Sequence, residues 1–180
     1  EALDKAAREN TELAAALGAH SANHLMAVTE EGIRAMKDAG VVPVVLPGTS
    51  FFLGKTTYAP ARKMWDDGLP VALATDYNPG SSMTPSMQMI ASLGCIALSL
   101  TPDEVLKATT WYPATALDRT SRKGAIHPGF DADLLLWKVH HWNQVPYEFG
   151  TNKVAQVYTG GVMIYQNYGE AFFSSYHRGQ

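Results

Sequence analysis

The stretch Val71-Ala72-Leu73-Ala74-Thr75-Asp76-Tyr77-Asn78-Pro79-Gly80-Ser81-Ser82 decides the expected fold. A short apolar run bounded by turn residues is typical of a strand buried on both faces, as in a parallel sheet. Asp76 therefore follows the end of a buried strand and precedes a loop rich in Gly and Ser. In a (β/α) barrel this is where chemistry is placed, and a carboxylate there can bind a metal ion or move a proton. Alternatively, Asp76 only caps a turn, as Asp before Asn-Pro-Gly often does.

Strands and helices alternate as far as residue 100. We expect strands at 19–25, 41–46 and 71–74, and helices at 2–17, 29–40, about 60–67 and 84–100, with a further helix starting at Thr101. Pro47-Gly48 is expected to end the second strand, and a loop with three aromatic residues follows it. Such alternation favours parallel βαβ units. Three strands cannot close a barrel, so they belong either to part of a barrel or to part of an open doubly wound sheet.

The character of the chain changes after about residue 120. A turn-rich bridge at 124–129 precedes an expected strand at 133–139. The segments 154–159 and 162–165 flank Gly160-Gly161, which is a strong hairpin signal. We therefore expect two domains, at 1–120 and 121–180, the second of them rich in β-structure.

The composition limits the classes of function. Hydrophobic residues make up 46% of the 180 residues and the formal net charge is −3, which indicates no electrostatic preference for nucleic acid or a membrane surface. No apolar run approaches the ~18–20 residues of a membrane span. The single Cys95 excludes an internal disulfide, so we expect a cytoplasmic protein. The chain opens inside a helical pattern without an initiator Met, and this predicts that it is part of a longer protein.

Two small-residue loops and several histidines are further candidates for a site. Residues 47–50 and 80–82 could present backbone N–H groups to a carboxylate. His20 and His24 have i, i+4 spacing, but their surroundings indicate a strand end and loop, so we expect them not to converge. His24 is either functional or a hydrogen-bonded structural residue. His-x-His, His-Glu-x-x-His and Cys clusters are absent from the sequence, which therefore contains no complete metal motif. The other histidines are weaker candidates: His127, His140, His141 and His177.

The order of several motifs resembles that of the imidazolonepropionases, amidohydrolase-superfamily enzymes of histidine degradation. The resemblance covers nearly the whole chain, and its most specific part is Thr75-Asp76-Tyr77-Asn78-Pro79-Gly80-Ser81. The other matching motifs are Ser21-Ala22-Asn23-His24-Leu25, Glu31-Gly32-Ile33, Leu46-Pro47-Gly48, Pro60-Ala61-Arg62-Lys63-Met64, Thr101-Pro102-Asp103-Glu104-Val105, Ala114-Thr115-Ala116-Leu117, Gly129-Phe130-Asp131-Ala132-Asp133-Leu134 and Tyr147-Glu148-Phe149-Gly150.

The resemblance implies an α/β fold, namely the C-terminal part of a metal-dependent (β/α)8 TIM-like barrel with part of a small β-sandwich. Residues 1–120 would then hold the last strands and helices of the barrel, and 121–180 the sandwich portion. The implied reaction is hydrolysis of the cyclic amide of imidazolone-5-propanoate to N-formimidoyl-L-glutamate by a metal-activated water. The implied cofactor is one divalent ion, zinc or iron, with most ligands outside this chain. The implied partners are the small-molecule substrate, the missing N-terminal half of the barrel and a second subunit in a homodimer.

The resemblance also implies roles for individual residues. Asp76 matches the metal-ligand aspartate that handles the proton of the attacking water. His24 matches a histidine that stabilises the developing oxyanion. The substrate's propionate and ring would be held by residues of the loop that follows: Asn78, Gly80 and Ser81.

The sequence departs from the family at several positions. Asn23 stands where the family has Asp, so an acid that orients His24 is absent. Without gaps, Glu1 falls at a metal-binding histidine and Asp4 at the catalytic glutamate, and the His-x-His of the first barrel strand is missing. We therefore expect the isolated chain to be inactive. Two alternatives stay open: another amidohydrolase, either a cyclic amidase or a deaminase, or a non-catalytic half-barrel that acts as a binding or assembly module.

Overall fold

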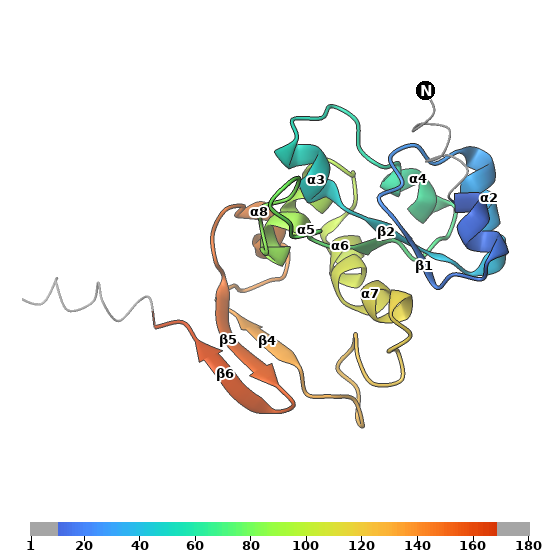
Figure 1. The fold of residues 1–180 in the computed structure, drawn as a ribbon. Helices are drawn as coiled ribbons and strands as arrows, with labels where there is room; N and C mark the ends of the chain where they lie inside the picture. Colours follow the sequence, from blue (N-terminus) through green and yellow to red (C-terminus); the bar gives the residue numbers. More distant parts are fainter. Residues whose placement is uncertain (1–10, 169–180) are drawn as a thin grey trace, which may run out of the picture.

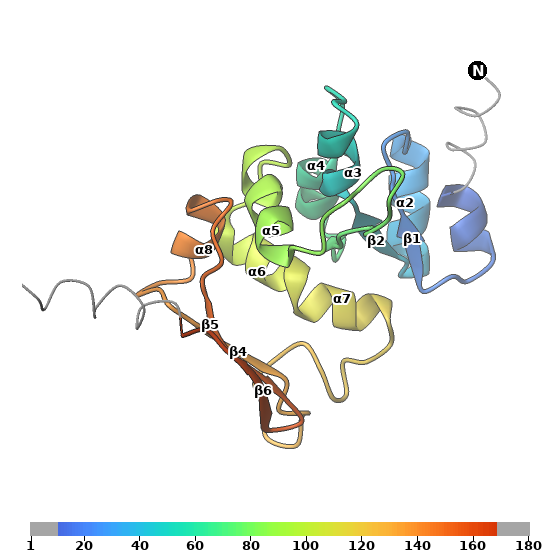
Figure 2. The ribbon, with the colours of Figure 1, turned by 60° about the vertical axis from the view of Figure 1, so that its left-hand side comes forward.

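The structure is a computed structural model that describes residues 11–168. Three parallel strands form its first sheet, in the order β1 (Ser21–Asn23), β2 (Val42–Val45) and β3 (Ala72–Leu73). The expected strands are confirmed, although each is shorter than predicted. Besides a helical stretch at 11–16, the helices of the described residues are α2 (Glu30–Ala39), α3 (Pro47–Phe52), α4 (Ala61–Asp66), α5 (Met87–Ile96), α6 (Pro102–Thr109), α7 (Trp111–Ala116) and α8 (Gln144–Tyr147). Helices α6 and α7 lie on one side of this sheet, and α2 and α4 lie on the other (Figures 1 and 2).

Local sequence signals mark both ends of α2 and the start of α6. The Thr29 hydroxyl accepts a hydrogen bond from the Gly32 N–H at the start of α2, and Gly40 ends that helix with a left-handed φ of 69°. Thr101 and Glu104 form a capping box at the start of α6. Both arrangements satisfy backbone groups that the helix itself leaves free.

Two predicted segments differ from the structure. Pro47-Gly48 does not open a loop but starts α3, because a proline fits the first turn of a helix, where its missing N–H is not needed. The helix expected at 84–100 is shorter, since Ser86 caps its start by accepting a hydrogen bond from the Met89 N–H. It ends before Ser99, whose backbone is left-handed at φ 57°.

A second, antiparallel sheet follows in the order β4 (Leu134–Trp137), β5 (Val154–Thr159) and β6 (Val162–Gln166). The predicted hairpin is confirmed, and its turn residues Gly160 and Gly161 both have positive φ, at 56° and 82°. Two left-handed residues suit the twist of a tight hairpin, which explains the pair of glycines.

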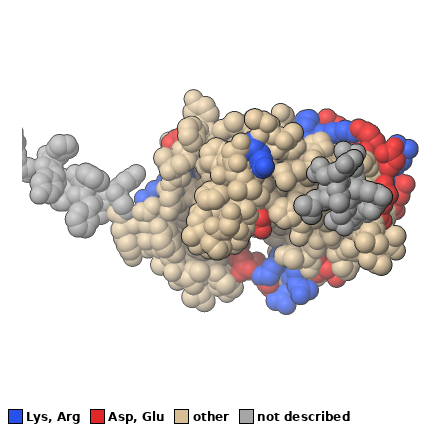
Figure 3. All heavy atoms as spheres, turned by 45° about the horizontal axis from the view of Figure 1, so that its top comes forward, with Lys and Arg blue, Asp and Glu red and all other residues tan. Residues whose placement is uncertain are grey.

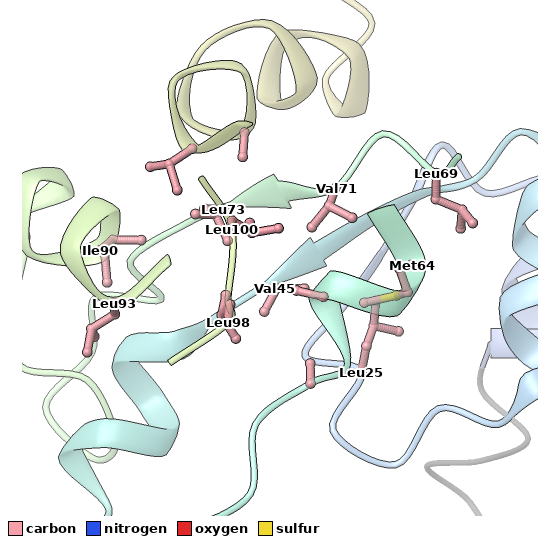
Figure 4. Close-up of a cluster of buried hydrophobic side chains, with 14 of the residues drawn as sticks. Leu25, Val45, Met64, Leu69, Val71, Leu73, Ile90, Leu93, Leu98 and Leu100 are labelled. Atoms are coloured by element: carbon pink, nitrogen blue, oxygen red, sulfur yellow. The ribbon is translucent and has the colours of Figure 1, made fainter. Parts of the chain in front are cut away.

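The core surrounds the first sheet and its helices (Figure 4). Strand and helix residues contribute to it from both sides of the sheet. The labelled side chains are Leu25, Val45, Met64, Leu69, Val71, Leu73, Ile90, Leu93, Leu98 and Leu100. Because this layer is tightly packed, it gives the ends of β1, β2 and β3 a rigid support.

Polar contacts join the second sheet to the helices of the first layer. The Gln88 side chain on α5 donates to Asn152 Oδ1 at 3.0 Å and accepts from the Lys153 N–H at 2.8 Å. The Trp142 indole N–H donates to the Pro102 carbonyl oxygen at 2.8 Å. These bonds connect the segment just before β5 to α5 and the segment just before α8 to α6.

Most of the described surface seen in Figure 3 is uncharged, and acidic and basic side chains gather near its borders. Among residues 11–168, no helix has the length and apolar character that crossing a membrane would require.

Candidate active site at the strand ends

The first sheet brings the main predicted residues to one edge. Its strands are parallel, so their carboxyl ends meet at the same side. His24 follows β1, the first turn of α3 follows β2, and Asp76 lies shortly after β3. This is the edge at which open and closed α/β sheets place their ligands.

Asp76 is held in a strained backbone conformation. Its φ is 50°, in the left-handed region that non-glycine residues rarely adopt. The Thr49 hydroxyl donates to Asp76 Oδ2 at 2.9 Å, and the Asn78 side-chain amide donates to the Asp76 carbonyl oxygen at 2.7 Å. Strain of this kind costs about 1–3 kcal/mol, persists only where the surroundings enforce it and clusters at functional sites.

His24 shares this feature on the far strand of the same sheet. His24 and Leu25 are both left-handed, with φ of 72° and 64°. The His24 N–H still donates to the Val44 carbonyl oxygen at 3.0 Å, and the Leu25 side chain is buried in the core. The chain is thereby anchored on both sides while the imidazole remains exposed. His20 lies before β1, so the strand separates the two histidines, as the sequence predicts.

The Asn78–Ser81 loop is built around the Asn78 side chain. Asn78 Oδ1 accepts hydrogen bonds from the Gly80 and Ser81 N–H groups, both at 2.9 Å, and Asn78 Nδ2 lies 3.0 Å from Ser81 Oγ. A backbone pair with Ser82 closes the loop. Asn78, and not Asp76, therefore caps this turn. The donors predicted to face a ligand are used within the loop in this structure.

Residues 47–50 differ from the expected donor loop. They form the first turn of α3, and the Thr49 N–H donates to the Leu46 carbonyl oxygen at 3.2 Å. Their side chains instead reach both neighbouring strand ends: Thr49 Oγ1 contacts Asp76, and Ser50 Oγ donates to Met26 Sδ at 3.2 Å. Thr49 was not among the predicted site residues. The available signal was a hydroxyl residue just after the strand next to the one that bears the aspartate.

The described residues do not form a metal site by themselves. Residues 11–168 contain no group of three His, Cys, Asp or Glu side chains that could hold a metal ion. Asp76 could supply one carboxylate ligand, but one carboxylate does not hold zinc or iron. Glu1, Asp4 and His177 lie outside the described residues.

Two hollows of the surface lie away from the strand ends. One of about 590 Å³ lies between α5, α6 and β4 and is lined mostly by apolar side chains, including Leu106, Leu135 and Trp137. The other, of about 660 Å³, lies beside α8 and includes Cys95, Tyr147 and Phe149. Burial raises the pKa of the Cys95 thiol, which disfavours a reactive thiolate there. The residues that line the two hollows do not include His24, Thr49 or Asp76.

The chain is similar to known proteins in sequence and in structure. Residues 1–164 match the amidohydrolase family. The chain is 50% identical over 153 residues to the imidazolonepropionase of Alkaliphilus oremlandii (strain OhILAs), which covers 85% of this chain and 36% of that protein. It is 46% identical over 156 residues to the imidazolonepropionase of Treponema denticola (strain ATCC 35405), which covers 87% of this chain and 38% of that protein. The chain thus spans little more than a third of the length of these curated relatives.

Solved structures show the same fold. An adenosine deaminase from Xanthomonas campestris with bound zinc superposes with a TM-score of 0.72 at 25% identity, over 79% of this chain and 36% of that chain. A 5-methylcytosine deaminase from Klebsiella pneumoniae superposes with a TM-score of 0.71 at 19% identity, over 87% of this chain and 43% of that chain.

Proposed function

The chain belongs to the amidohydrolase family, and from that premise we propose that it forms part of an enzyme that hydrolyses the cyclic amide of imidazolone-5-propanoate to N-formimidoyl-L-glutamate. The observation that carries the proposal is Asp76, which lies at the carboxyl edge of the parallel sheet in an enforced left-handed conformation. It lies in a chain that is 42–50% identical to several imidazolonepropionases.

Each residue of the strand ends has a role in this proposal. Asp76 accepts a proton from the water that attacks the ring carbonyl carbon and returns it to the ring nitrogen as the C–N bond breaks. His24 stabilises the charge that develops on the carbonyl oxygen. Asn78, Gly80 and Ser81 contact the propionate and ring, which requires that hydrogen bonds inside the loop be shared with the substrate. Asp4 is the further proposed catalytic carboxylate, outside the described residues.

We propose one divalent cation, zinc or iron, as the cofactor, with Asp76 as one of its ligands. Such a cation supplies a polarised water at neutral pH. The remaining ligands would have to come from outside the described residues, because these contain no sufficient cluster.

The proposed partners follow from the sheet. Within the described residues, β1 and β3 each pair with β2 alone, so each has one unpaired edge. We propose that further barrel strands, from the N-terminal half of the same barrel, pair with these edges. Residues 1–120 would form this part of the barrel and 121–180 a portion of a sandwich domain, in a homodimeric cytoplasmic enzyme.

A deaminase is the second candidate, because both solved structures described above are deaminases. A non-catalytic half-barrel is the third. The three differ in their products: ring hydrolysis releases N-formimidoyl-L-glutamate, deamination releases ammonia, and a binding module releases neither.

The test uses the protein at its natural length with imidazolone-5-propanoate as substrate, and mass spectrometry and an ammonia assay as readouts. Asp76→Asn should lower kcat by about 10²–10⁴-fold, the usual contribution of a general base. Asp118→Asn is the matched control, since Asp118 is also left-handed, at φ 52°, but exposed after α7. Ring opening that survives in Asp76→Asn, or a wild-type protein without ring opening, would contradict the proposal.

A further inference from the structure

We propose that Thr49 is a positioning residue for Asp76: its hydroxyl fixes the orientation of the carboxylate and leaves one oxygen available for chemistry. This inference rests on the proposed function for its consequence in catalysis, although the positioning itself can be measured without a substrate.

The contact is specific to one carboxylate oxygen. Thr49 Oγ1 donates to Asp76 Oδ2 at 2.9 Å, across 27 positions of sequence. From the described residues, no hydrogen bond reaches Asp76 Oδ1. A bond from a hydroxyl to an ionised carboxylate is charge-assisted and stronger than one between neutral groups. Thr49 therefore sets the rotation of the carboxylate, while Oδ1 remains free to accept a proton or bind a cation.

Thr49 is itself rigid. Its N–H donates to the Leu46 carbonyl oxygen, and its own carbonyl oxygen accepts from the Leu53 N–H at 3.1 Å, so the backbone is fixed within α3. The residue is buried, as are both residues before it in the same turn. Gly48 lies so close to the strand end that a Cβ there would be 2.9 Å from Ser82 Oγ and 3.0 Å from Ile90 Cδ1. A donor supported in this way loses little freedom when it binds the carboxylate.

The Asp76 side chain needs such a partner. A left-handed aspartate is strained, and the Asn78 bond to its carbonyl oxygen holds only the main chain. The Asp76 side chain is half-buried, so water could otherwise reach it and allow other rotamers. Hydrogen-bond partners that orient a metal-ligating side chain typically contribute 10–100-fold in metal affinity or activity, and this is the size expected for Thr49 with Asp76 as a proposed ligand.

Ser82 offers a matched comparison. Its buried hydroxyl donates to the Thr75 carbonyl oxygen at 2.6 Å, next to Asp76 in the chain but not to the carboxylate. Removing the Ser82 hydroxyl deletes a buried hydrogen bond at the same place in the fold. It should lower stability without freeing the Asp76 side chain.

The first experiment is NMR on the protein at its natural length, using three-bond couplings to Asp76 Cγ to measure the χ1 rotamer. Thr49→Val keeps the shape and removes the donor, Thr49→Ser keeps the donor, and Ser82→Ala is the control. We expect averaged couplings in Thr49→Val only, and Thr49→Ala replaces it if the valine variant does not fold. Couplings that stay unchanged without the Thr49 hydroxyl would overturn the proposal, as would equal averaging in Ser82→Ala.

The second experiment measures kcat and KM for the natural-length protein and its variants. Thr49→Val should lower kcat about 10–100-fold with little change in KM, and Thr49→Ser should restore most of kcat. Ser92→Ala removes a buried hydroxyl that donates to the Gln88 carbonyl oxygen within α5, so it should leave kcat near the wild-type value. A loss in Thr49→Val that serine does not restore would overturn the proposal. If the wild-type protein does not open the ring, the proposed function fails while the NMR result still decides whether Thr49 positions Asp76.

Discussion

The two sheets of this protein differ in how deeply their strands are buried. Strands β2 and β3 of the first sheet are almost entirely buried, whereas β1 at its edge and all three strands of the second sheet contain only half-buried and exposed residues. In β6 alone, Val162, Met163, Ile164 and Tyr165 are all exposed. Burial of apolar surface is the main favourable term in folding, so the first sheet and its helices must supply most of the stability of the described residues.

This difference explains where strain is tolerated. Three of the five left-handed non-glycine residues among the described residues are His24, Leu25 and Asp76, all just beyond the strand ends of the first sheet. The packed layer beneath them can offset a strained backbone, as functional sites require. The second sheet relies on local contacts instead: Asp131 and Asp133 pair with Arg122 and Lys123, and Trp137 stacks edge-on against Trp142.

The largest expected effect comes from replacing one isoleucine in each region: Ile90 in α5, which packs against the first sheet, and Ile164 in the second sheet. Ile90 is 0% exposed in α5, and Ile164 is 64% exposed in β6. Ile90→Ala should lower the free energy of unfolding by about 2–5 kcal/mol, because it removes buried methyl groups and leaves a cavity. Ile164→Ala should change it by less than about 0.5 kcal/mol. Urea unfolding followed by circular dichroism measures both, and similar losses would show that the second sheet is buried in solution.

A smaller effect separates the glycines of the two regions. Close packing against Ser82 and Ile90 leaves little room for a Cβ at position 48. Gly48→Ala should therefore lower the free energy of unfolding by about 1–3 kcal/mol. Gly160 has nothing within 4 Å and needs only a left-handed backbone. Gly160→Asn should therefore be nearly neutral in the free energy of unfolding, because asparagine followed by glycine suits this turn. The same urea titration tests both variants, and a neutral Gly48→Ala would refute the close packing.

The sequence predicts what is encoded locally. Thr29 and Gly40 mark the ends of α2, Thr101 and Glu104 mark the start of α6, and Gly160-Gly161 marks the hairpin, because each signal acts within a few residues. The position of Asp76 after a buried strand follows from the same kind of pattern.

Contacts between segments that are distant in the sequence have no such local signal. The hydrogen bond from Thr49 to Asp76 spans 27 positions of sequence, and no periodicity or motif predicts it. The start of α3 was missed for a related reason. Pro47-Gly48 suits both a turn and a helix start, and only packing against Ser82 and Ile90 decides between them.

The smallest predicted effect concerns pH and the ion pairs of the second region. Arg122 first and Lys123 second hold the pKa of Asp131 below its usual value of 3.8, and Lys123 and the Gly160 N–H do the same for Asp133. A carboxyl whose folded pKa lies below its unfolded pKa adds stability above the unfolded value, and this is lost as pH falls through the folded pKa. The ion pairs beside the second sheet should therefore weaken below about pH 4.

The Gly160 amide reports this change directly, because it donates to Asp133 Oδ1 at 2.9 Å. Its NMR chemical shift should titrate at acidic pH, and Asp133→Asn should abolish the titration. The Met89 amide, which donates to the Ser86 hydroxyl, contacts no titratable group through that bond and should stay constant in the same series. These pairs are largely exposed, so salt should weaken them as well. A Gly160 amide that does not respond to acid, with Asp133 present, would mean that the second sheet is held by something other than its ion pairs. In that case, the polar contacts of Gln88 and Trp142 would be the next candidates for what holds the second sheet in place.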